Sequence, residues 1–206
     1  KMGPSLQILT IVANFCEVWL AKEGHEGVVG INLLEKVQLP NLPSLYGAML
    51  AGVDYVLMGA GIPREIPGAL DAFSRNEPGS LRIAVEGAPP EEEHRFTLDP
   101  KKLFGDQLPP LKRPDFLAII SSDVLGEALL KRANGKINGF IIENDLAGGH
   151  NAPPRGQLRK NERGEPIYGP RDTANLDRMK AFGLPFWLAG DYGSPERFAG
   201  AIAAGA

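Results

Sequence analysis

Residues 116–142 read FLAIISSDVLGEALLKRANGKINGFII and contain a short apolar run, a helix-compatible stretch and a second apolar run. The two runs, 116–120 and 139–142, are short and lack polar alternation, which predicts strands that are buried on both faces. Between them, the serine–aspartate pair at 122–123 is suited to cap a helix that continues to Arg132. Such a strand–helix–strand order is typical of parallel strands covered by helices.

The same rhythm extends in both directions along the chain. It predicts strands over 8–13, 28–33, 54–58 and 185–189, an extended run over 81–85, and helices over 15–22, 44–51, 66–74, 173–182 and from 194 onward. Two architectures of the α/β class fit this alternation, a doubly wound open sheet and a (β/α)8 TIM barrel. No G-x-G-x-x-G sequence follows the first run, which disfavours the dinucleotide-binding open sheet.

Two stretches interrupt the rhythm. One, at about 86–114, contains two proline pairs and an acidic run and resembles an inserted loop. The other, at about 151–171, is a long loop that follows a glycine pair and a histidine. We expect the whole chain, residues 1–206, to be a single domain that carries both loops.

Composition narrows the classes of function. The formal net charge is −3, so no global positive field is present to hold nucleic acid or an anionic membrane. The single cysteine cannot form an internal disulfide, which favours a reducing compartment such as the cytoplasm. The apolar runs are shorter than a bilayer requires, and no charged-then-apolar leader opens the sequence. We therefore expect no membrane partner and no signal peptide.

Reactive residues of parallel α/β folds collect at the carboxyl ends of strands. Segment 143–150, ENDLAGGH, follows one predicted strand and presents His150 after two adjacent glycines. Imidazole takes and returns a proton near neutral pH, so His150 is a candidate base. The alternative is a tight turn at Gly148-Gly149 followed by a solvated histidine.

The segment 189–193, AGDYG, leads from another predicted strand into a helix that Ser194 caps. Backbone N–H groups and the positive end of a helix suit a phosphate group at such a position. The alternative is an ordinary strand-to-helix turn. Three scattered histidines and one cysteine offer no zinc-ligand spacing, so we expect no metal.

Four stretches together resemble the nitronate monooxygenase (2-nitropropane dioxygenase-like) family, whose members are FMN-dependent TIM barrels. In chain order they are Gly30-Ile31-Asn32-Leu33, the run from Asp54 to Pro63, Ala147-Gly148-Gly149-His150, and Pro185 to Gly190 with the helix that follows. They occur in the family's order and cover most of the chain. The resemblance implies a (β/α)8 barrel whose first and last strands lie outside this sequence.

The resemblance also implies roles for particular residues. Asn32, Gly148 and Gly149 would lie against non-covalently bound FMN, and Gly190 would help to hold its phosphate. His150 would be the catalytic base. The reaction would be the oxidation of alkyl nitronates or nitroalkanes with molecular oxygen. The resemblance leaves open whether the protein forms a homodimer.

The sequence departs from the family at two further cofactor-binding candidates. Glu143 stands where glutamine is common, and a carboxylate donates a hydrogen bond only when protonated. Asp191 stands where a small residue is usual, which would place a negative charge beside a phosphate.

Two alternatives remain open on the sequence. The same barrel face serves NAD(P)H-dependent flavin reductases of enoyl thioesters or quinones. The second alternative is a cofactor-free barrel fragment without catalysis.

Overall fold

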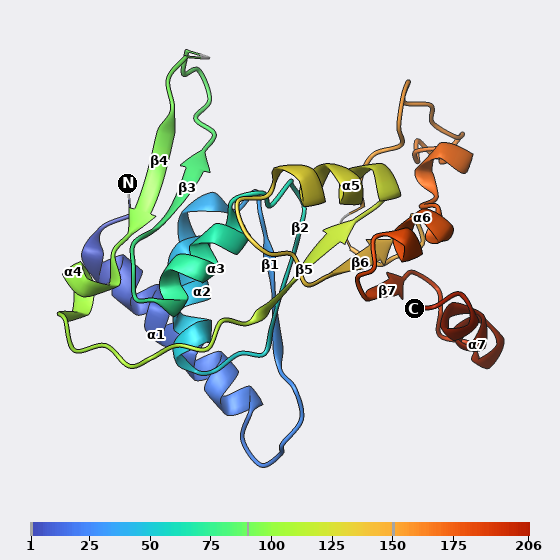
Figure 1. Ribbon diagram of the computed structural model, residues 1–206. Coiled ribbons are helices and arrows are strands. Elements are labelled where there is room, and N and C mark those ends of the chain that lie inside the picture. The colour runs from blue at the N-terminus through green and yellow to red at the C-terminus, as the bar shows by residue number, and fades with distance from the viewer. Residues whose placement is uncertain (1, 90, 150) are drawn as a thin grey trace. The chain divides into compact units, whose positions relative to one another are not determined.

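The structure is a computed structural model that describes residues 2–89, 91–149 and 151–206 (Figure 1). The chain is α/β, with parallel strands in the order β1-β2-β5-β6-β7 and a separate antiparallel pair, β3-β4. The parallel strands and the helices between them confirm the predicted class. Within the described residues the strands do not close into a barrel.

The helices and strands follow one another in the order that the labels of Figure 1 give. They are α1 (Pro4–Ala21), β1 (Gly30–Leu34), α2 (Gln38–Leu50), β2 (Tyr55–Gly59), α3 (Ile66–Ser74), β3 (Gly79–Ile83), β4 (His94–Leu98), α4 (Pro100–Phe104), β5 (Asp115–Ile120), α5 (Asp123–Arg132), β6 (Gly139–Glu143), the 3₁₀ helix η1 (Pro170–Asp172), α6 (Leu176–Ala181), β7 (Phe186–Ala189) and α7 (Pro195–Ala203).

The chain divides into two compact units. The first unit comprises Lys1–Phe116 and Ala133–Ile137, and the second comprises Leu117–Arg132 and Asn138–Ala206. One domain can contain both units, so the single domain expected from the sequence stays a prediction.

The first helix corrects the sequence prediction, which placed a strand over 8–13. Those residues form the middle of α1, which begins with Pro4 at a position where a missing N–H costs nothing. The β-branched residues of the run favour a strand only weakly, because tertiary packing routinely overrides such propensity. Ile11 and Val18, seven residues apart, are the buried residues of this helix and lie on one helical face.

The packing of α1 on α2 depends on Gly47. A Cβ at this position would overlap the backbone carbonyl of Ile11, so only glycine allows this close approach of the two helices. Beside it, Asn14 Nδ2 donates to Ser44 Oγ over 3.1 Å, and Ser44 is buried. The helix predicted over 44–51 begins six residues too late, because α2 starts at Gln38 and contains Pro43 within it.

Among the described residues, α1 is the one helix long and apolar enough to cross a bilayer by length and composition. The sequence prediction, which considered shorter runs, missed this property. Core helices and signal sequences share it, so it does not place the chain in a membrane.

The core of the first unit lies between its helices and strands. Strands β1 and β2 pair in parallel, with Gly30 opposite Tyr55 and Leu34 opposite Gly59. Fully buried side chains from α2, β2 and α3, including Leu42, Tyr46 and Phe73, fill the space beside them. Burial of such side chains is the main stabilising term of the unit.

Asp54 joins three segments just before β2. Its carboxylate accepts hydrogen bonds from Lys22 Nζ at 2.6 Å and from the backbone N–H of Val29 at 3.0 Å, and Lys112 Nζ lies 3.6 Å away. The hydrogen bond from Lys22, with that from Val29, lowers the pKa of Asp54 below its usual value. The carboxylate therefore anchors the end of α1 to the start of the sheet.

The stretch at about 86–114, expected to be loop-like, contains regular structure. It holds β4, which pairs with β3 in an antiparallel hairpin, and α4. Asp99 caps α4 by accepting from the N–H groups of Lys101 and Lys102. Figure 1 shows the hairpin as a two-stranded ribbon.

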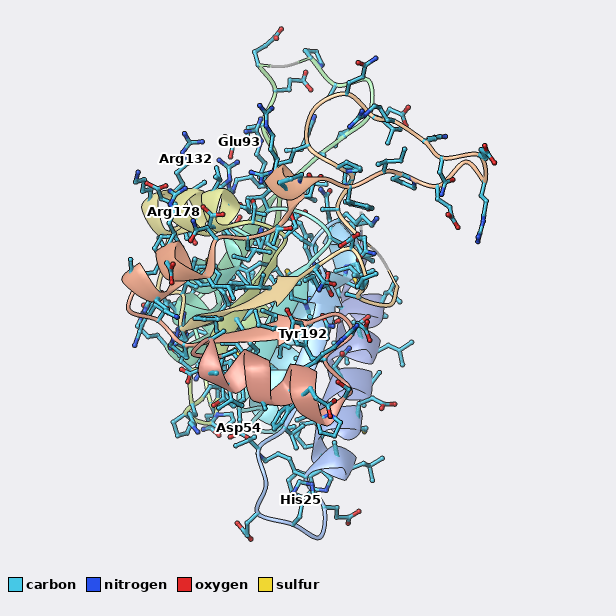
Figure 2. All side chains as sticks on the ribbon, turned by 90° about the vertical axis from the view of Figure 1, so that its right-hand side faces the viewer. His25, Asp54, Glu93, Arg132, Arg178 and Tyr192 are labelled. Atoms are coloured by element: carbon cyan, nitrogen blue, oxygen red, sulfur yellow. The ribbon has the colours of Figure 1, made fainter. Side chains whose placement is uncertain are left out.

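In the second unit, β5, β6 and β7 pair in parallel. Helix α5 spans the residues that the sequence predicted, 123–132. Arg178 of α6, labelled in Figure 2, pairs with Asp123 and Glu127 of α5, with N–O distances of 2.7 Å to each carboxylate. These ion pairs fix α6 beside α5.

Candidate functional site

The carboxyl ends of β6 and β7 lie side by side in the second unit. Glu143, the last residue of β6, is paired with Ala189, the last residue of β7. The N–H of Asn144 donates to the Ala189 carbonyl over 3.1 Å and extends the ladder by one step. The turns that follow both strands therefore start from the same edge, as expected for parallel strands.

Asn144 ties these two turns together. Its Nδ2 donates to the Gly190 carbonyl at 3.1 Å, and its Oδ1 accepts from the N–H of Leu146 at 2.9 Å. Gly190 has φ = 118°, which side chains rarely tolerate, and a Cβ there would overlap Asn144 Oδ1. Glycine is thus required at 190 by its own backbone and by Asn144.

The predicted glycine turn is open to its surroundings. Gly148 and Gly149 are exposed, and a Cβ on either would meet no heavy atom within 4 Å. Gly149 has φ = 90° and needs glycine for that reason. Asn151 fixes the turn, because its Nδ2 donates to the carbonyls of Asp145 and Ala147 at 3.1 and 3.2 Å. These hydrogen bonds join Asn151 to the start of the turn, and the two glycines have open space beside them.

Asp191 is compensated by a cation. Its carboxylate forms an ion pair with Arg197, which also donates from Nη1 to the Asp191 carbonyl at 3.1 Å. Asp191 has φ = 57°, a left-handed conformation that aspartate tolerates better than most residues. The positive charge of the arginine offsets the negative charge that would otherwise repel a phosphate.

The predicted cap of α7 is confirmed. Ser194 Oγ accepts from the N–H of Arg197 at 3.2 Å, and Pro195 occupies the first helical position. Figure 2 labels Tyr192 in the turn that leads from β7 into this helix. The turn therefore brings a left-handed backbone, a helix N-terminus and a guanidinium group together.

Two further site residues were predicted, Asn32 and His150. Asn32 lies in the first unit, where it is exposed and is the middle residue of β1 rather than its last. His150, the predicted base, lies outside the described residues. The other predicted site residues lie in the second unit: Glu143 ends β6, Gly148 and Gly149 lie on the turn after it, and Gly190 and Asp191 follow β7.

The long loop at about 151–171 is tied at its base. Asp172 accepts hydrogen bonds from the backbone N–H groups of Arg155 at 2.7 Å and Gly169 at 2.8 Å. Those two bonds, Arg155 first, lower the pKa of Asp172. Tyr168 adds a hydrogen bond from its hydroxyl to the Ala152 carbonyl at 3.0 Å. These hydrogen bonds therefore hold the two ends of the loop together.

Sequence reasoning missed Asn144, Asn151 and Arg197. Asn144 carried a usable signal, because asparagine directly after a strand often accepts from a backbone N–H two residues on. Arg197 carried none, since its pairing with Asp191 spans a turn and a helix start. Across residues 2–89, 91–149 and 151–206, no group of three histidine, cysteine or acidic side chains is placed to hold a metal ion.

Neither a scan of known protein-family models nor a search of curated proteins gives a match to this chain.

Proposed function

We propose that the chain is part of an FMN-dependent oxidoreductase that oxidises alkyl nitronates or nitroalkanes with molecular oxygen. The proposal includes a (β/α)8 barrel, to which the five parallel strands would belong, and a cytoplasmic location. The observation that carries it is the junction at the ends of β6 and β7, where Asn144 binds Gly190 beside an open glycine turn.

The residues at this junction fit the cofactor. Gly148 and Gly149 leave room for a planar ring against the backbone, because a Cβ on either would meet nothing. The start of α7 supplies positive potential for a phosphate, and the ion pair with Arg197 offsets the charge of Asp191 beside it. The carboxylate of Glu143 would accept a hydrogen bond from a ring N–H.

When bound, FMN would accept two electrons from the substrate and pass them to oxygen. His150 would remove the acidic proton from the carbon beside the nitro group and hold it as an imidazolium. Asn151, the next residue in the sequence, donates hydrogen bonds to the carbonyls of Asp145 and Ala147 at the start of the glycine turn.

The first test is the visible spectrum of the full-length protein with added FMN. Saturable binding of the flavin supports the proposal, and a colourless protein whose melting temperature FMN does not change supports the cofactor-free alternative. Bleaching by NADH without oxygen would identify the reductase alternative instead.

The second test is His150→Ala. We expect turnover of nitroethane to fall about 10²- to 10⁴-fold while FMN binding is unchanged, because a positioned base supplies a factor of that size. His25→Gln is the control, since His25 lies in the exposed loop after α1. Equal turnover in the His150 variant and the wild type would remove the base from the proposal.

A further inference from the structure

The first unit contains a hollow of about 410 Å³ that the proposed flavin site does not use. It is lined by residues that follow β1 and β2, by the start of α3, and by residues of the β3–β4 hairpin. Its volume lies within the range of about 300–1,000 Å³ that small-molecule sites occupy. Apolar side chains, among them Ile62, Leu81 and Ile83, line it together with charged ones.

The acidic side chains on the hairpin side have partners. Glu65 accepts from the N–H of Arg82 at 2.6 Å and pairs with Arg95 at 3.2 Å. Arg95 also pairs with Glu93, which Figure 2 labels, at 2.7 Å. Glu92, which also lines the hollow, lies 3.1 Å from His94 Nε2, so the carboxylates on this side each lie against a basic side chain.

Two other arginines, which line the hollow, differ from Arg95 in forming no close ion pair among the described residues. Arg64 and Arg82 are among its lining residues, and in the described parts of the chain their guanidinium groups form no hydrogen bond or close ion pair. The charge of Arg64 acts on Glu35 and that of Arg82 on Glu93, so each arginine has one carboxylate in its neighbourhood. Both side chains are exposed, so a ligand can reach them. Helices α2 and α3 also begin at this edge, and their N-termini add positive potential.

The remaining groups can assist an anion. Gln38 Oε1 accepts from the N–H of Ala84 at 3.0 Å, so the amide of Gln38 keeps its N–H groups as donors. Glu35 is half-buried against Gly61, whose missing Cβ makes room for the carboxylate. Burial raises the pKa of Glu35, and the charge of Arg64 opposes part of that rise.

We propose that this hollow binds a small organic anion through Arg64 and Arg82, with a carboxylate or a phosphate held by the two guanidinium groups. Each guanidinium presents paired N–H donors in the geometry that these oxyanions accept. The apolar lining accommodates a short carbon skeleton attached to the anionic group. The site is independent of the proposed flavin chemistry.

The test is calorimetric titration of the full-length protein with succinate and, separately, with inorganic phosphate, at constant ionic strength. Saturable binding of succinate alone identifies a carboxylate ligand, and binding of phosphate alone that the double variant Arg64→Gln/Arg82→Gln loses identifies a phosphate ligand. We expect Arg64→Gln and Arg82→Gln each to weaken binding at least about tenfold, the loss typical of one charge-assisted contact.

Two controls separate this hollow from other cationic surfaces. Arg75→Gln changes an arginine at the far end of α3, and Arg197→Gln changes the proposed phosphate position of the second unit. Both should leave succinate binding unchanged. A shift of the Gly61 amide resonance on adding succinate to the wild type places the ligand without any substitution. Absence of saturable binding, or equal binding by the double variant Arg64→Gln/Arg82→Gln, would overturn the proposal.

Discussion

One glycine of the first unit and two of the second serve different ends. In the first unit, Gly47 is held between two helices, where any side chain would strike the backbone of Ile11. In the second unit, Gly148 and Gly149 have open space where a Cβ would stand. Packing requires glycine at position 47, whereas it does not require glycine at positions 148 and 149. A glycine that packing does not require is the better candidate for contact with a ligand.

Carboxylates hold segments together in both units, and Asp191 differs from them in its exposure. In the first unit, the carboxylates of Asp54 and Glu65 each hold separate segments together through short hydrogen bonds. In the second unit, Asp191 pairs with Arg197 at the mouth of an exposed turn. The turns of the second unit are less buried, as expected where binding loops are set on a rigid scaffold.

The largest expected effect is that of Gly47→Ala. Overlap with a backbone carbonyl cannot be relieved by a side-chain rotation, so we expect a loss of about 3 kcal/mol in the free energy of unfolding. Urea denaturation measures it. Gly200→Ala in α7 is the matched control, because a Cβ there meets nothing and should stabilise by about 0.5–1 kcal/mol. Similar values for both variants would contradict the contrast between the units.

Gly190→Ala comes next. The left-handed φ and the overlap with Asn144 predict a loss of about 1–3 kcal/mol, together with weaker FMN binding. Gly148→Ala sharpens the comparison, since its φ is not left-handed and its surroundings are open. It should change stability by less than about 0.5 kcal/mol and still weaken FMN binding. Unaltered FMN binding by the Gly148 variant would argue against a cofactor on this turn.

Asp54→Asn removes a carboxylate that three segments share. We expect a loss of about 1–2 kcal/mol at neutral pH, the usual range for hydrogen bonds to a charged group. The pKa of Asp54 is lowered in the folded chain, so its contribution is present above the unfolded pKa and is lost as pH falls through the folded pKa. Urea denaturation across acidic pH measures this. The variant should show a smaller decrease in stability with acid than the wild type, and parallel curves would contradict the role.

The smallest effect is expected from Asp172→Asn. The amide keeps one acceptor for the N–H groups of Arg155 and Gly169 but loses the charge, so the base of the long loop should loosen without global unfolding. The lowered pKa predicts the same loosening in the wild type as pH falls through the folded pKa. Limited proteolysis within 156–166 reports it as faster cleavage. Asp177→Asn, on an exposed aspartate of α6, should cleave at the wild-type rate.

Much of the second unit could be predicted from local sequence. The strands near 116–120 and 139–142, the helix over 123–132 and the serine cap of α7 all agree with the structure. Each rests on an interaction between residues close in sequence: a run of apolar side chains, or a side chain that accepts from an N–H three residues on. The glycine turn that follows β6 was identified for the same reason.

The first unit shows where local sequence was insufficient. The β-branched run of residues 8–13 suits a strand, and the glycine that allows α1 to pack as a helix lies some 35 positions away, in α2. The hollow beside β1 and β2 forms because the β3–β4 hairpin pairs across a stretch without a regular pattern.

The sequence by itself determined the alternation of strands and helices, and with it the edge at which chemistry-bearing residues collect. Only the tertiary structure decided that residues 4–21 form one helix, that Arg197 neutralises Asp191, and that Arg64 and Arg82 line one hollow. The physical reason is the separation in sequence between the groups that interact. Hydrophobic period and capping act within a few residues, whereas close helix packing, ion pairing and cavity formation depend on groups that only the folded chain brings together.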